Sequence, residues 1–323
     1  MAWRPDPMLP GYECREIPLP QEPTVTGETP GSLRATLVRR NEPSQPRAVL
    51  YVHGWNDYFF HTHVADFFAS CGVDFYAIDL RRYGRSLVEG QKAGYISALS
   101  EYYAELDAAL ALVRADHDRI AVLGHSTGAL TSALWVADRP GQFAALLLNA
   151  PWVARHPSEP RHGLMRMVLA GLSSLDPLRP VPSAEGFYAR TLHVSQDGEW
   201  DYNLDYKGHP AFKPRLGWCQ AVLEGHSRVA KGLNIDCPVF AMLSKRYDPS
   251  TTWSEALTRA DVVFDVGRNA NRVPSLGDQV TVVRIDGAKH DVFLSLPQAR
   301  QAAFAELSRW MSCYFPAEEP GQA

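Results

Sequence analysis

Short runs of hydrophobic residues alternate along the chain with longer segments of helical periodicity. Residues 97–114 carry apolar side chains three to four positions apart, which predicts a helix with one buried face. The runs 48–52 and 144–148 contain only hydrophobic residues, which is typical of strands buried on both faces. Further strands are predicted over 33–38, 73–78, 120–123, 239–243 and 279–285, and further helices over 59–70, 129–137 and 298–313. This alternation predicts an α/β fold with a mostly parallel sheet and helices on both of its faces.

The alternation stops after Pro151 and resumes near residue 237. Residues 152–236 are instead rich in proline, glycine, histidine and aromatic residues. The simplest organisation is one α/β core, formed by residues 1–151 and 237–323, into which residues 152–236 are inserted as a cap or lid. The first thirty residues are rich in proline and glycine, and we expect them to form an arm with one edge strand.

The composition is that of an ordinary globular protein. The chain has 323 residues, of which 46% are hydrophobic and 21% charged, and a net charge of −4. This charge offers no basic surplus for nucleic acid or for an anionic membrane. The five cysteines are widely spaced and form no C-x-x-C pair, which is typical of a reducing compartment. Because the N-terminus lacks a signal-peptide pattern and no apolar run is long enough to cross a bilayer, we expect a cytoplasmic protein without an integral membrane segment.

The strongest chemical signal is the sequence Gly-His-Ser-Thr-Gly at residues 124–128. It follows the predicted strand 120–123 and precedes the predicted helix 129–137, which is the context of a G-x-S-x-G nucleophile elbow. A strained turn between strand and helix exposes Ser126, and the glycines leave room for the neighbouring backbone. The helix that starts there directs its positive dipole end toward the negative charge that develops when a serine attacks a carbonyl. Ser126 is therefore the predicted nucleophile.

A serine nucleophile needs a base, and the chain contains eleven histidines. His290 follows the predicted strand 279–285, in a loop at the carboxyl end of a strand, where parallel sheets place their chemistry. We predict His290 as the base. His125 is part of the elbow, and its ring is expected to pack there. His61 and His63 are two positions apart on a predicted helix and cannot share a face, so we expect them at the surface.

Two aspartates are candidates for the acid that orients the histidine. Asp248 follows the predicted strand 239–243 closely, but a residue before Pro249 is also suited to a turn. Asp261 lies 29 residues before His290, with room for one helix and one strand between them. We predict Asp261 as the acid and keep Asp248 as the alternative.

An oxyanion that forms during acyl transfer needs two hydrogen-bond donors. The backbone N–H of Thr127 follows the serine, and the backbone N–H of Trp55 lies in the loop after the predicted strand 48–52, which supplies the second donor in this architecture. We expect the neighbouring His53 and Gly54, together with Trp152, to contact the substrate. No residue pattern indicates a cofactor or a metal ion.

In their order along the chain, these motifs resemble the α/β-hydrolase superfamily, and within it the group of monoacylglycerol lipases, lysophospholipases and related esterases. The matching segments are 51–55, 78–86, 123–128, 149–151, 237–239 and 287–295. The resemblance implies an eight-stranded sheet with an inserted lid. In relatives, an aspartate, two or three apolar residues and a second aspartate open the helix after the acid; residues 261–265 fit this pattern. Arg82 departs from the resemblance, because glycine is common at that position.

Residues and resemblance together predict a carboxylic-ester hydrolase that needs no cofactor. Its partner would be a small-molecule ester or lipid, such as a monoacylglycerol, a lysophospholipid or a simple acyl ester. An aminopeptidase of the same superfamily is an alternative that would need acidic residues in the lid to receive a free amine; the candidates are Glu185, Glu199, Asp201 and Asp205. An acyltransferase and a non-catalytic binding protein on the same scaffold are further alternatives. The oligomeric state, the acyl chain length and the alcohol stay open.

Overall fold

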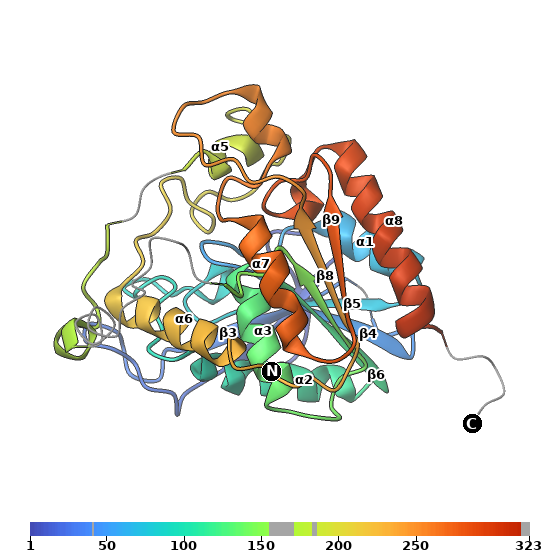
Figure 1. Ribbon diagram of the computed structural model, residues 1–323. Coiled ribbons are helices and arrows are strands. Elements are labelled where there is room, and N and C mark those ends of the chain that lie inside the picture. The colour runs from blue at the N-terminus through green and yellow to red at the C-terminus, as the bar shows by residue number, and fades with distance from the viewer. Residues whose placement is uncertain (41, 155–170, 183–185, 318–323) are drawn as a thin grey trace.

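The computed structural model describes residues 1–40, 42–154, 171–182 and 186–317, and within these ranges nine strands form a single sheet (Figure 1). Their order across the sheet is β1-β2-β3-β5-β4-β6-β7-β8-β9. The pairings of β1, β2 and β3 are antiparallel and those from β5 to β9 are parallel, which confirms a mostly parallel sheet. The strands are β1 Arg4–Pro5, β2 Glu13–Pro18, β3 Arg34–Arg39, β4 Arg47–Val52, β5 Asp74–Asp79, β6 Arg119–His125, β7 Ala145–Asn149, β8 Val239–Ser244 and β9 Val280–Ile285. The predicted count of eight is wrong, because the two-residue β1 adds a strand beside β2 at the edge.

Helices cover both faces of this sheet, as predicted (Figure 1). They are α1 Thr62–Ser70, α2 Tyr103–Arg114, α3 Thr127–Ala137, α5 Tyr188–Leu192, α6 Leu216–Val229, α7 Val266–Arg272 and α8 Pro297–Tyr314. Short 3-10 helices span Gly84–Ser86, Leu99–Tyr102, Glu255–Arg259, Val273–Leu276 and Val292–Leu294. α2, α3 and α6 pack on one face, and α1 and α8 pack on the other. Among the described helices, none is both long and apolar enough to span a membrane.

Alternating side chains of the central strands enter two separate hydrophobic cores. In β4, Ala48, Leu50 and Val52 face the core beneath α2, α3 and α6, whereas Val49 and Tyr51 face the core beneath α1 and α8. Successive side chains of a strand point to opposite faces, so a central strand covered on both sides must be hydrophobic at every position. This requirement explains the uninterrupted apolar runs in the sequence.

The N-terminal arm is bound to the core through buried arginines that follow β5. Each of these arginines forms an ion pair with an acidic residue of the arm; the pairs are Arg81–Glu22, Arg82–Glu28 and Arg85–Asp6. Arg82 has a φ of 65°, a backbone conformation that favours glycine. This conformation explains why glycine is common at this position in the hydrolases that the sequence resembles. Here Glu28 holds the Arg82 guanidinium with two hydrogen bonds, and the Tyr95 carbonyl accepts a third. The arm therefore fixes a loop that lies beside the candidate site.

Residues 152–236 connect β7 to β8 and include α5 and α6. α6 packs against α3, and its Trp218, Ala221 and Val222 join the core on that face of the sheet. α5 lies above the carboxyl ends of the parallel strands in Figure 1. The hydroxyl of Tyr188 on α5 accepts a hydrogen bond from the backbone N–H of Asp291 at 3.2 Å. The connecting segment thus contacts both the core and the loop that carries His290.

Candidate active site

Ser126 lies in a sharp turn between β6 and α3, as the elbow motif predicts. Its backbone has a φ of 53° and a ψ of −115°, a strained conformation for a residue with a side chain. The turn leaves no space for a side chain at either flanking glycine. A Cβ on Gly128 would lie 2.1 Å from the carbonyl oxygen of His53, and one on Gly124 would lie 2.6 Å from the Cα of Ala129. The sequence can form this turn only because both flanks lack a side chain.

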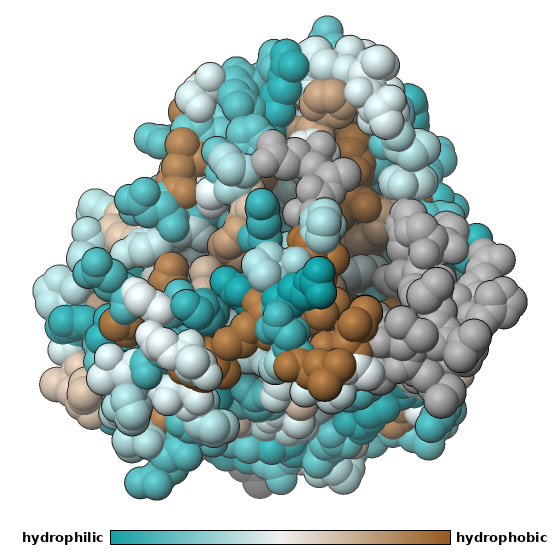
Figure 2. Space-filling model, turned by 90° about the vertical axis from the view of Figure 1, so that its left-hand side faces the viewer, coloured by the Kyte–Doolittle hydropathy of each residue, from teal (hydrophilic) through white to brown (hydrophobic). Residues whose placement is uncertain are grey.

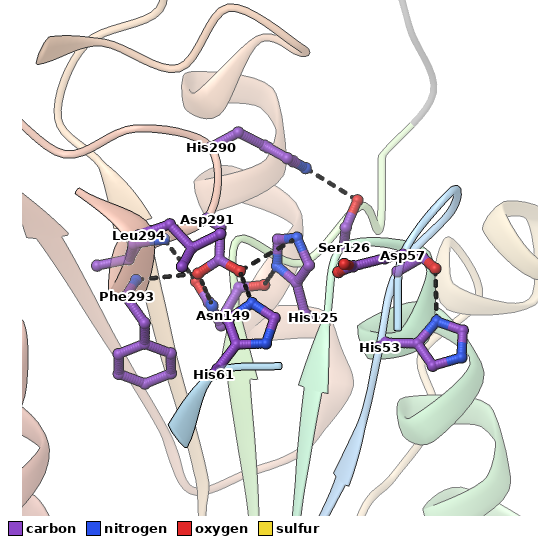
Figure 3. Close-up of polar contacts among 12 residues, drawn as sticks. His53, Asp57, His61, His125, Ser126, Asn149, His290, Asp291, Phe293 and Leu294 are labelled. Atoms are coloured by element: carbon purple, nitrogen blue, oxygen red, sulfur yellow. Dashed lines mark hydrogen bonds and ion pairs between the residues drawn. The ribbon is translucent and has the colours of Figure 1, made fainter. Parts of the chain in front are cut away.

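The structure brings Ser126, His290 and Asp261 into one hydrogen-bonded chain. His290 Nε2 is 2.9 Å from Ser126 Oγ (Figure 3), and His290 Nδ1 is 2.9 Å from Asp261 Oδ2. The rings of Phe264 and Tyr188 contact the imidazole edge to face, which restrains its orientation. All three polar residues are buried, with exposed fractions of 8% for Ser126, 3% for His290 and 0% for Asp261. Such a chain can move a proton from the hydroxyl to the imidazole.

The two candidate acids lie next to each other, but only one carboxylate faces His290. Asp261 Oδ1 accepts the backbone N–H groups of Val263 and Phe264, which leaves Oδ2 for the histidine. Asp248 lies beside it, because its backbone N–H donates to the carbonyl of Asp261 at 2.8 Å. The Asp248 carboxylate instead accepts hydrogen bonds from the Arg246 side chain and the Ser250 N–H. The geometry therefore favours Asp261 over Asp248.

The backbone N–H groups of Trp55 and Thr127 come from neighbouring strands. β4 and β6 are paired in parallel with Val52 opposite Gly124, so the loop after β4 lies beside the elbow. In the described part of the chain neither N–H has a hydrogen-bond acceptor, and both residues line the cavity above Ser126. Thr127 also opens α3, whose dipole directs positive potential to this point. Two unpaired donors beside a serine hydroxyl suit a developing oxyanion.

Two hydrogen bonds hold the His53 ring in place. Its Nδ1–H donates to the Gly54 carbonyl at 2.7 Å, and its Nε2 accepts the Leu80 N–H at 3.0 Å. Burial lowers the pKa of His53, which keeps the ring neutral in this pair of bonds. Neither His53 nor Gly54 lines the large cavity, whereas Trp152 does. His53 therefore joins the loop after β4 to the loop after β5.

A cavity of about 430 Å³ opens above Ser126 and His290. Its lining includes seven aromatic side chains, which are Trp55, Trp152, Tyr188, Tyr202, Phe212, Trp218 and Phe264. Histidines apart, Lys207 is the charged side chain among the described lining residues, and its Nζ donates to Asp57 at 2.7 Å. On the face of the molecule in Figure 2, hydrophobic residues gather in the middle, with hydrophilic residues among them and on their left. The size and lining are those of a site for a small, largely apolar ligand.

The described cavity lining contains no carboxylate that would receive a free amine. Of the acidic residues considered for that role, Glu199, Asp201 and Asp205 are exposed and do not line the cavity. Glu185 lies outside the described residues.

Behind the serine lies a second buried polar cluster that the sequence analysis missed. Asp291 Oδ2 is 3.2 Å from His61 Nε2 and 3.8 Å from His125 Nε2 (Figure 3). The expected surface position of His61 is wrong: α1 begins only at Thr62, and the His61 ring, 2% exposed, turns inward to Asp291. His63 is half-buried and its Nε2–H donates to the carbonyl of Phe293. The signal available in the sequence was the acidic residue directly after His290.

Asp57, His125 and Asp291 place ligand atoms within 4.8 Å of one another and so form a candidate metal centre within the described chain. Protein donors already compensate both carboxylates. Asp57 Oδ1 accepts the Lys207 ammonium, and Asp291 accepts hydrogen bonds from Asn149 and His61. Asp57 Oδ2 is buried without a hydrogen-bond partner in the described chain, so these contacts satisfy Asp291 but leave one oxygen of Asp57 unpaired.

The arrangement of strands, elbow and histidine loop is that of an α/β hydrolase. Residues 43–245 match the serine aminopeptidase S33 family, and the chain belongs to this family. A monoacylglycerol lipase of Mycolicibacterium smegmatis is 31% identical over 161 residues, which cover 48% of this chain and 54% of that protein's length. A monoglyceride lipase homolog of monkeypox virus is 22% identical over 272 residues, which cover 82% of this chain and 90% of the relative.

The fold is also that of a solved lipase structure. A soluble variant of monoglyceride lipase from Saccharomyces cerevisiae, in complex with a substrate analog, superposes with a TM-score of 0.63 at 12% identity, over 90% of this chain and 96% of that one. At such low identity the similarity concerns the fold alone. Family and relatives together confirm the resemblance to the monoacylglycerol lipase group that the motifs predict.

Proposed function

We propose that this protein is a serine hydrolase that cleaves carboxylic esters through an acyl-enzyme intermediate. The observation that carries the proposal is the continuous chain from Ser126 Oγ through His290 to Asp261, with 2.9 Å at each contact. Lipases among the relatives of the chain support the same reaction class.

In the first half of the reaction, Ser126 attacks the ester carbonyl while His290 Nε2 takes the hydroxyl proton. The backbone N–H groups of Trp55 and Thr127 donate to the oxyanion of the tetrahedral intermediate. Asp261 accepts the Nδ1–H of His290 and stabilises the imidazolium. The imidazolium then gives its proton to the leaving alcohol, which breaks the ester bond and leaves the acyl group on Ser126.

In the second half, a water molecule replaces the alcohol. His290 takes a proton from the water as it attacks the acyl carbonyl, and the same N–H groups stabilise the second oxyanion. Return of the proton to Ser126 Oγ releases the carboxylic acid. Competition between water and another alcohol at this step separates a hydrolase from an acyltransferase.

The cavity favours monoacylglycerols, lysophospholipids or simple acyl esters over peptides. Its aromatic walls suit an apolar acyl group, and the described lining lacks the carboxylate that would hold a free α-amine. We infer that residues 152–236 act as a lid, because Tyr188, Tyr202, Phe212 and Trp218 from this segment line the cavity. A lid of this kind sets both the access to Ser126 and the length of acyl chain that fits.

The test is hydrolysis of p-nitrophenyl esters from acetate to palmitate by the wild type and by Ser126→Ala. We expect turnover by the wild type with an optimum in acyl chain length, and loss of turnover together with loss of fluorophosphonate labelling in the variant. Amino-acid p-nitroanilides, with a free α-amine, serve as the peptidase control and are expected to be poor substrates. A folded wild type that neither turns over any ester nor reacts with the fluorophosphonate would show that the proposed function is wrong.

A further inference from the structure

Asn149, the last residue of β7, bonds to both segments that carry the reacting groups (Figure 3). Its main-chain carbonyl accepts the N–H of Ser126 at 3.0 Å and the Nδ1–H of His125 at 3.1 Å. Its side-chain Nδ2 donates to Asp291 Oδ1 at 2.7 Å, and its Oδ1 accepts the N–H of Val292 at 3.0 Å. One fully buried residue therefore connects the nucleophile elbow to the loop that follows the base.

In the loop that follows His290, Asp291 is the residue whose side chain contacts Asn149. Its Oδ1 accepts the N–H of Phe293 as well as the Asn149 amide, and its Oδ2 accepts the Nε2–H of His61. Burial alone would raise the pKa of Asp291, but the neighbouring His125 and His61, together with the hydrogen bonds from His61 and Asn149, hold it well below its usual range. The carboxylate therefore stays ionised, with both oxygens able to accept hydrogen bonds.

We propose that Asn149 and Asp291 are positioning residues that set the distance between Ser126 Oγ and His290 Nε2; the inference rests on the function proposed above. Ser126 is held by the Asn149 carbonyl, and His290 directly precedes Asp291 in the chain. Movement at the Asn149–Asp291 hydrogen bond therefore changes the alignment of nucleophile and base.

Neither positioning residue lines the cavity, so their effect differs from that of a residue that binds substrate. The cavity lining that contacts the substrate is the same whether or not the Asn149–Asp291 hydrogen bond forms. KM is therefore expected to change little. Proton transfer from serine to imidazole depends on alignment, because a misplacement of about 1 Å can cost about a hundredfold in rate. The expected signature is a fall in kcat without a matching rise in KM.

The experiment measures kcat and KM for the best p-nitrophenyl ester, the rate of fluorophosphonate labelling, and Tm. Asn149→Ala and Asp291→Ala are each expected to lower kcat and the labelling rate by about 10- to 100-fold, with KM within about threefold. The double variant is expected to resemble the single ones, because all three cut the same link. Tyr76→Phe is the matched control: it removes a buried hydrogen bond to His117 in another part of the sheet and is expected to leave kcat unchanged.

Asp291→Asn tests the hydrogen bonds separately from the charge. The amide oxygen can still accept from Asn149 and Phe293, and the amide N–H₂ can face His61, whose Nδ1 has no partner in the described chain, so its tautomer can switch. This variant is expected to keep kcat within about threefold of the wild type. If Asn149→Ala is too unstable to assay, Asn149→Leu, which keeps a similar side-chain volume but has neither donor nor acceptor, is expected to show the same fall.

Several outcomes would overturn the inference. They are a kcat within twofold of the wild type in the Asn149 and Asp291→Ala variants, a loss confined to KM, and an Asp291→Asn variant as slow as Asp291→Ala. A wild type that is itself inactive and unlabelled would instead refute the proposed function, so the two failures are distinguishable.

Discussion

Replacement of Asp261 by asparagine is expected to reverse the tautomer of His290. Asp261 Oδ1 accepts the N–H groups of Val263 at 2.7 Å and Phe264 at 3.2 Å, so the amide oxygen of an asparagine must take that place. The amide N–H₂ then occupies the position of Oδ2, 2.9 Å from His290 Nδ1. Because the amide N–H₂ donates a hydrogen bond, the imidazole must offer a lone pair at Nδ1 and carry its proton at Nε2.

A proton at His290 Nε2 prevents that atom from accepting the proton of Ser126. The loss expected from a wrongly held tautomer is about 10³- to 10⁴-fold in kcat, or roughly 4 to 5.5 kcal/mol of transition-state stabilisation. Tm should change little, since the asparagine oxygen keeps both backbone hydrogen bonds. Activity and stability are therefore expected to separate.

The assay is ester hydrolysis by purified Asp261→Asn, with Asp248→Asn as the matched control. Asp248 lies beside Asp261, but its carboxylate is bonded to Arg246 and to the Ser250 N–H, so its variant should keep kcat within about twofold. The reasoning would be refuted if Asp261→Asn kept more than about a tenth of the activity while Asp248→Asn lost most of it.

Three further predictions concern stability and can be checked by denaturant unfolding. Gly128→Ala should destabilise the fold by about 3 kcal/mol or more and abolish activity, because its Cβ would lie 2.1 Å from the His53 carbonyl oxygen; equal stability would contradict the steric argument. Glu105→Gln should cost about 3 to 5 kcal/mol, because the fully buried Arg81 loses its main charge partner, and a cost below 1 kcal/mol would mean that this ion pair contributes little. Burial lowers the pKa of Lys289 from 10.5 to about 8, so between these pH values the unfolded chain binds more protons and the free energy of unfolding rises with pH. Relative to Lys289→Met, the wild type should therefore gain up to about 3 kcal/mol from pH 8 to pH 10.5, and a constant difference would contradict this shift.

The core of the fold was predictable because a buried strand or helix face appears in the sequence as a local pattern of apolar residues. β4 and β7 are covered on both faces and must be apolar at consecutive positions, and the run 48–52 lies within β4 as observed. The predicted helix 97–114 is α2 preceded by a 3-10 helix over Leu99–Tyr102, since periodicity alone does not separate the two kinds of turn. β1 was not predicted, because a two-residue strand shows no periodicity.

The positions of Ser126, His290 and Asp261 were also predictable, for a different reason. Parallel strands end at one edge of the sheet, so residues that follow β6 and β9 meet there wherever they lie in the sequence. Sequence position does not separate Asp248 from Asp261 as the acid. Both lie in the segment after β8, and only in the folded chain does the Asp261 carboxylate face His290 while that of Asp248 faces Arg246.

The buried polar contacts were not predictable, because each depends on a partner far away in the chain. His61 and Asp291 are separated by 230 residues, and Arg82 and Glu28 by 54, and all four residues are buried. A histidine or arginine that will be buried looks like a surface residue in the sequence, because its polarity is compensated only in the folded state. In this protein these contacts surround the site: Glu28 holds the loop after β5, and Asp291 holds the loop of His290. Local patterns thus identify the groups that react, whereas distant polar pairs determine how accurately those groups are held.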